Sequence, residues 1–244
     1  APIRVMTVLM SVATCCGLPG SLVFADTWDV LNPERPARPA TREFETDVCI
    51  VGGGSGGLGA AIAAAREGAR VILVERQRRL GGTGANALVS TWAPGPGCSI
   101  AEEMYRRMKA IGGAGVAKGY PVHTDAPMAF LMVTDGERYE STLTSALPGD
   151  RQRRHLPCSV PFKPDAFDKV ARQMLAETGS ATVLDETTFF HAEPNAEKTR
   201  VDSILVEDSH GGVARIRAKV FIDSTGEVWL ARALGCETVL GVDP

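Results

Sequence analysis

From residue 46 onward, short apolar runs alternate with helix-like segments, and this pattern predicts the first elements. The run DVCIV, residues 47–51, is apolar and rich in β-branched side chains, which predicts a buried strand. The alanine-rich segment LGAAIAAAREGA, residues 58–69, predicts a helix that ends near Gly68. The run RVILVE, residues 70–75, predicts a second buried strand. A strand, a glycine-rich turn, a helix and a strand in this order form a βαβ unit.

Helices and then a group of strands are predicted in the rest of the chain. Residues 99–113 carry early glutamates and end in glycines, and residues 163–179 begin with Pro164 and Asp165, so each predicts a helix. Runs at 181–193, 201–208 and 213–219 predict strands, with the turn SHGG between the last two. The run VFIDSTGE, 220–227, predicts a strand that enters a Thr-Gly turn. We therefore expect an α/β fold in which a β-meander returns to the first sheet.

The N-terminal segment has a different character. From Val5 to Ala25 the chain carries no charge, and Arg4 directly precedes this run. The helix breakers Pro19 and Gly20 and the small residue at Ala25 favour a secretory signal peptide cleaved after that alanine. A membrane anchor is the alternative, because the run is just long enough to span a bilayer. The first interpretation predicts an exported protein, periplasmic or extracellular; the second predicts membrane association through this segment alone.

Composition narrows the classes of function. The 244 residues are 44% hydrophobic and 23% charged, which is ordinary for a folded domain. The formal net charge of −3 gives no sign of a nucleic-acid surface. The cysteines are spaced without a C-x-x-C pattern, so neither a zinc site nor a disulfide framework is predicted. Residues 26–45 carry three prolines among charges and predict an extended linker.

The glycine cluster VGGGSGGLGA, residues 51–60, holds two overlapping copies of the pattern G-x-G-x-x-G. One frame uses Gly52, Gly54 and Gly57, and the other uses Gly54, Gly56 and Gly59. A phosphate-binding turn leaves its strand immediately, so that the following helix points its N-terminus at the anion. Because Gly52 directly follows the predicted strand, the first frame is favoured.

Each glycine of this frame has its own task. Gly52 permits the sharp turn, Gly54 lets a pyrophosphate approach the backbone, and Gly57 lets the helix pack closely on the strand. Glu75 ends the second strand, where its carboxylate can accept hydrogen bonds from ribose hydroxyls. This acid also argues against NADP, because it would repel a 2′-phosphate.

The stretch DVCIVGGGSGGLGAAIAAAREGARVILVERQRRLGGTGA resembles the N-terminal signature of FAD-dependent oxidoreductases of the glutathione-reductase-like group. A second stretch, AKVFIDSTGEVWLARALG, is similar to the strand, A/S-T-G-D/E turn and helix of the same family. The resemblance implies a Rossmann-like FAD-binding domain, with a parallel sheet, flanking helices and a β-meander, and part of an inserted substrate domain. It places the FAD-binding domain at 46–98 and 165–244 and an insertion at 99–164.

The resemblance also implies the residues that hold FAD. Backbone at the glycine turn would receive the pyrophosphate, an acid and its basic neighbour would hold the adenosine, and a second glycine pair would run along the cofactor towards the flavin. A residue of the later strands would contact adenine, and the second turn would lie near the cofactor. The implied residues are Gly52, Gly54, Ser55, Gly56, Gly57, Glu75, Arg76, Gly82, Thr83, Asn86, Phe189, Thr225 and Gly226.

The family implies an enzyme that transfers hydride or electrons between a small-molecule substrate and FAD, with a separate electron acceptor. The pair Glu75–Arg76 followed by GGT favours FAD, although spacing alone leaves an NAD-dependent dehydrogenase open. A non-catalytic FAD-binding module is the third interpretation. Family members usually continue well beyond the S-T-G turn, so the resemblance implies an N-terminal fragment of a longer flavoprotein. No catalytic residue, metal ligand or nucleic-acid partner is predicted.

Overall fold

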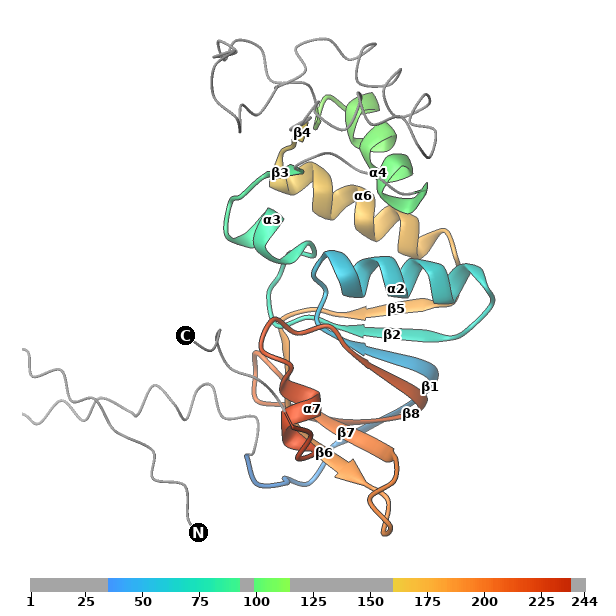
Figure 1. Cartoon of the computed structure of the whole chain (residues 1–244), viewed down its shortest axis with the longest axis vertical. Helices are drawn as coiled ribbons and strands as arrows, with labels where there is room; N and C mark the ends of the chain where they lie inside the picture. Colours follow the sequence, from blue (N-terminus) through green and yellow to red (C-terminus); the bar gives the residue numbers. More distant parts are fainter. Residues whose placement is uncertain (1–34, 93–98, 115–159, 238–244) are drawn as a thin grey trace, which may run out of the picture. The chain divides into compact units, whose positions relative to one another are not determined.

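The computed structural model describes residues 35–92, 99–114 and 160–237 (Figure 1). These residues form a six-stranded sheet in the order β5-β2-β1-β8-β7-β6. Its strands are β1 (Arg42–Val51), β2 (Val71–Val74), β5 (Ala181–Leu184), β6 (Thr187–Pro194), β7 (Val201–Asp208) and β8 (Val213–Asp223). Strands β5, β2, β1 and β8 run parallel, whereas β8, β7 and β6 form an antiparallel meander. The expected mixed α/β arrangement is confirmed.

Alternate residues of the parallel strands face two separate apolar cores. Ile50 and Leu73 face helices α2 (Ser55–Arg66) and α6 (Pro164–Ala176), which cover one face of the sheet (Figure 1). Helix α4 (Ser99–Ala110) adds its methionines Met104 and Met108 to the same core. The strands are apolar on both faces because helices cover one face and the meander covers the other.

The second core joins the parallel strands to the meander. Cys49 and Ile72 pack with Ile204 of β7 and Ile216 of β8. The short helix α7 (Trp229–Ala233) closes this core with Trp229 and Leu230. Burial raises the pKa of the Cys49 thiol to about 12, so this cysteine is an inert apolar side chain, as its strand position predicts.

The remaining elements lie beside the first core. Helix α3 (Gly82–Asn86) follows β2 and was not predicted from the sequence. The short strands β3 (Thr91–Trp92) and β4 (Val160–Pro161) pair with each other. Trp92 packs on Phe162 and Phe167, with ring centroids 5.1 and 5.8 Å away. Trp92 is therefore a half-buried aromatic that packs against the first core.

Strand β1 begins at Arg42, within the range predicted as linker, and residues 35–41 already contact the meander. Arg35 and Arg38 lie over the ring of Phe190 and pair with Glu207. The predicted signal peptide or anchor, residues 1–25, lies outside the described residues. Within the described residues, no helix has the length and apolarity needed to cross a membrane.

Candidate functional site

A cavity of about 620 Å³ opens where β1, β2 and β8 end and where α2 begins. In open α/β sheets, ligands bind at the carboxyl ends of the strands. Most of the residues that the sequence singles out line it together: Gly52, Gly54, Ser55, Glu75, Arg76, Gly82, Thr83, Asn86, Phe189, Thr225 and Gly226. The structure therefore brings residues from the beginning and the end of the chain to one cavity.

The turn after β1 fits tightly between α2 and the end of β8. Gly52 has a φ of +102°, and a Cβ there would lie 2.5 Å from the carbonyl oxygen of Ser224. A Cβ on Gly57 would lie 1.9 Å from the carbonyl oxygen of Gly52. By contrast, a Cβ on Gly59 would meet nothing within 4 Å. The backbone thus requires glycine at Gly52 and Gly57 of the first frame, whereas a Cβ on Gly54 would reach only an ordinary contact, 3.9 Å from the Cα of Gly82. The close packing expected of Gly57 is confirmed.

The N-terminus of α2 lies at this cavity. Gly54 precedes the helix in extended conformation and lines the cavity together with Ser55. Within the described part of the chain, no side chain caps α2, and no acidic residue lies in its first turn. The first N–H groups of a helix carry partial positive charge and need acceptors. This turn therefore fits a diphosphate of a dinucleotide, which would supply those acceptors.

Gly54 lies against the second glycine turn of the chain. A Cβ on Gly82 would lie 3.0 Å from the Cα of Gly54, so the two turns meet without side chains between them. Gly82 and Thr83 begin α3 and line the cavity. A ligand that starts at α2 can therefore continue along the backbone of α3.

Glu75 is a buried acid at the end of β2, with 6% of its surface exposed. Its Oε2 accepts a hydrogen bond of 2.6 Å from the Gly53 N–H, and its Oε1 accepts one of 2.7 Å from the Gln77 N–H. These two bonds join the glycine turn to the loop after β2. A carboxylate has about four lone-pair sites, so Glu75 keeps acceptor capacity for hydroxyl groups of a ligand in the cavity.

Residues from the end of the chain close the side of the cavity near Glu75. The Arg76 guanidinium lies 5.5 Å from the ring centroid of Trp229 and 4.0 Å from a carboxylate oxygen of Glu227. Glu227 and Trp229 follow a turn that Asp223 stabilises. Its Oδ1 accepts hydrogen bonds from the Thr225 N–H and hydroxyl. Trp229 is buried at 7% exposure and forms part of the cavity wall.

Two predicted residues do not line the cavity. Gly56 faces the Ser224 hydroxyl, which would lie 3.1 Å from a Cβ there, and Gly57 faces the turn. Sequence reasoning did not single out Gln77, Thr187 or Thr188 as site residues, although they line the cavity. The sequence predicts one strand-like run over 181–193, whereas the structure divides it into β5 and β6. Thr187 starts β6, and its N–H donates to the Glu75 carbonyl, a contact that the pattern does not reveal.

Within residues 35–92, 99–114 and 160–237, no three His, Cys, Asp or Glu side chains are grouped so as to hold a metal ion. The described site combines glycine-rich backbone, one buried acid, polar side chains and the aromatic side chains of Phe189 and Trp229.

Comparison with known proteins gives a family match across most of the chain. The family model described as FAD dependent oxidoreductase matches residues 47–244. A curated relative, 6-methylpretetramide 4-monooxygenase from Streptomyces rimosus, is 56% identical over 43 residues, which are 18% of this chain and 10% of that protein.

Among similar solved structures, PieE supports the same fold. The flavin-dependent monooxygenase PieE, in complex with FAD and substrate, is 17% identical with a TM-score of 0.51, over 80% of this chain and 33% of PieE. THI4 from Thermovibrio ammonificans is 20% identical with a TM-score of 0.46, over 79% of this chain and 64% of THI4. The chain thus spans less than two thirds of the length of each of these relatives.

Proposed function

Because the chain belongs to the FAD dependent oxidoreductase family, whose cofactor is FAD, we propose that it binds FAD in the cavity at the ends of β1, β2 and β8. We further propose that it is an oxidoreductase that transfers hydride or electrons between a small-molecule substrate and the flavin. The observation that carries this proposal is the joint placement of the uncapped α2 N-terminus, the buried acid Glu75 and the Gly82–Thr83 turn around one cavity. When bound, the isoalloxazine of FAD supplies the redox chemistry.

Different residues of the chain would bind different parts of FAD. The amides at the start of α2 would receive the pyrophosphate, and Glu75 would accept hydrogen bonds from the adenosine ribose. Arg76 and Trp229 offer a cationic group and an aromatic ring beside that position, which suit the adenine base. The backbone at Gly82 and Thr83 would direct the rest of the cofactor away from the adenosine.

The absorbance spectrum of the purified protein tests this proposal directly. We expect bands near about 370 and 450 nm, because the isoalloxazine is the chromophore of a bound flavin. Denaturation in acid should release FAD, which chromatography distinguishes from FMN. A folded protein without these bands that also takes up no added FAD would contradict the proposal. Tight binding of NAD by such a protein would favour a dehydrogenase of similar fold.

We also propose that the protein is exported. The support is the uncharged run from Val5 to Ala25, with its preceding arginine and its small residue at the end. Expression with this run intact should yield a protein whose mature N-terminus is Asp26, which N-terminal sequencing or mass spectrometry would show. An uncleaved protein recovered in the membrane fraction would favour the anchor, and an uncleaved protein in the cytosol would contradict both.

A further inference from the structure

A cluster of polar side chains binds the loop that connects two parts of the cofactor cavity wall, Glu75 and the Gly82–Thr83 turn. This loop, Arg76–Gly81, runs from Glu75 at the end of β2 to the glycine turn that starts α3. On its outer side lies a second cavity of about 850 Å³, whose walls are almost entirely charged or amide side chains. The two cavities adjoin, because Gln77 and Asn86 line both.

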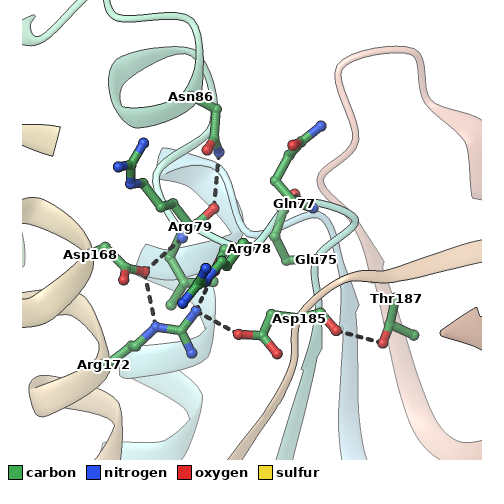
Figure 2. A network of polar contacts seen from close by, with 10 residues as sticks. Glu75, Gln77, Arg78, Arg79, Asn86, Asp168, Arg172, Asp185 and Thr187 are labelled. Atoms are coloured by element: carbon green, nitrogen blue, oxygen red, sulfur yellow. Dashed lines mark hydrogen bonds and ion pairs between the residues drawn. The ribbon is translucent and has the colours of Figure 1, made fainter. Parts of the chain in front are cut away.

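Arg172 of α6 is at the centre of the cluster (Figure 2). Its Nη2 donates a hydrogen bond of 2.6 Å to the backbone carbonyl of Arg78 and one of 2.7 Å to the carboxylate of Asp185. Its Nε donates to Asp168 at 3.0 Å. One guanidinium thus binds the loop backbone, its own helix and the corner after β5. A planar fork with several fixed donors suits this arrangement better than a lysine would.

The partners of Arg172 extend this hold to both ends of the loop. Asp168 Oδ1 also accepts the Leu80 N–H at 2.9 Å, directly before the glycine turn. Asn86 of α3 donates to the carbonyl of Arg79 at 2.9 Å. The backbone carbonyl of Asp185 accepts the hydroxyl of Thr187 (Figure 2). The Thr187 N–H in turn donates to the carbonyl of Glu75.

The charged groups around Arg172 bond to one another, which indicates a supporting role and not a ligand site. Arg172 is bound by two carboxylates and a carbonyl, and Arg79 pairs with Asp165 at 2.7 Å. Partial burial lowers the pKa of Arg172, but the carboxylates of Asp168 and Asp185 raise it above its usual value. The guanidinium therefore stays charged at any working pH and keeps its hold on the loop.

We propose that Arg172 is a positioning residue for FAD, which fixes the loop Arg76–Gly81 so that Glu75 and the Gly82–Thr83 turn keep the spacing that the cofactor needs. This inference rests on the proposed function for its ligand. It assigns to α6, which does not line the cofactor cavity, a share in cofactor affinity. Binding energy is gained when a site is held in place before its ligand arrives, because less ordering is needed on binding.

The test compares Arg172→Met with Arg107→Met. Arg107 of α4 is a matched control: its two Nη atoms bind the Glu177 carboxylate at 2.7 Å, and it is 29% exposed against 34% for Arg172. In the protein stripped of cofactor, FAD titration followed by flavin fluorescence gives Kd, and urea unfolding gives stability. We expect Arg172→Met to raise Kd roughly tenfold or more, the effect of losing a charge-assisted hydrogen bond, and Arg107→Met to leave it nearly unchanged. Arg172→Lys should recover part of the affinity.

Hydrogen exchange in the cofactor-free protein tests, without FAD, whether Arg172 fixes the loop Arg76–Gly81. The Leu80 amide should exchange at least about tenfold faster in Arg172→Met than in Arg107→Met, because its acceptor Asp168 loses its partner. If Arg172→Met is unstable, Arg172→Lys carries the comparison. Equal Kd values for the Arg172 and Arg107 variants, or unchanged Leu80 exchange, would overturn the inference. If the wild-type protein binds no FAD, the proposed function fails, while the exchange result still decides whether Arg172 holds the loop.

Discussion

Replacing Gly57 by alanine is expected to weaken FAD binding severely and to destabilise the protein, whereas Gly59→Ala, two positions further along the same helix, is expected to do neither. A Cβ at Gly57 would lie 1.9 Å from the carbonyl oxygen of Gly52, far inside contact distance. This oxygen belongs to the backbone of a turn that is itself held against Ser224. The methyl group can therefore fit only if α2 moves away from the turn.

The size of the effect follows from what this movement disturbs. Forcing one extra carbon into a packed site costs about 1–3 kcal/mol, and the obstacle here is backbone and not a flexible side chain. The movement would also carry the first amides of α2 away from the position of the pyrophosphate. We expect at least about a hundredfold rise in the FAD Kd, because several charge-assisted hydrogen bonds are lost together.

Gly59→Ala is the control because a Cβ there meets nothing within 4 Å. Alanine is favoured over glycine inside a helix by about 0.5–1 kcal/mol, so this variant should be as stable as the wild type or slightly more so. Urea unfolding and FAD titration of both variants measure the two effects. Equal FAD affinity in the two variants would show that the tight contact at Gly57 does not shape the site, and a strong loss in Gly59→Ala would favour the other glycine frame.

The sequence pattern was sufficient for the parts of the fold in which local chemistry determines the backbone. The buried strands β1 and β2 follow from their apolar runs, and the choice of Gly52 as the first turn residue follows from its place after Val51. The Asp223–Gly226 turn could be placed because a strand pattern ends in a Thr-Gly pair. In each case the deciding interactions lie within a few residues along the chain.

Contacts between segments far apart in the sequence could not be predicted from such local patterns. Helix α3 has only five residues, and its start depends on Gly81 in a left-handed conformation against Phe167 of α6. The hydrogen bond from Arg172 to the Arg78 carbonyl joins residues 94 positions apart. No local sequence pattern indicates the start of α3 or the hydrogen bond of Arg172. An arginine one turn after an aspartate in a helix usually indicates only a surface ion pair.

The second large effect is expected for Glu75→Gln, which changes one oxygen of the site into an amino group. Each oxygen of Glu75 accepts a backbone N–H, one from Gly53 and one from Gln77. In glutamine, one of these N–H groups would face the donor NH₂ and lose its acceptor. An unsatisfied buried donor costs about 1–3 kcal/mol, so the cofactor-free protein should lose stability even before FAD is considered.

FAD binding should weaken further, because the amide also offers one acceptor oxygen fewer to the ribose hydroxyls and lacks the negative charge that strengthens such bonds. We expect a rise in the FAD Kd of about a hundredfold in Glu75→Gln, measured by titration beside urea unfolding. Glu45→Gln is the matched control: it removes the same charge at an exposed position of β1, outside the cofactor cavity, and should change neither quantity. A stable Glu75→Gln protein with wild-type affinity would mean that FAD does not use this acid. A loss of stability with unchanged affinity would mean that Glu75 only connects the glycine turn to the Gln77 loop. Another residue of the cavity would then bind the ribose.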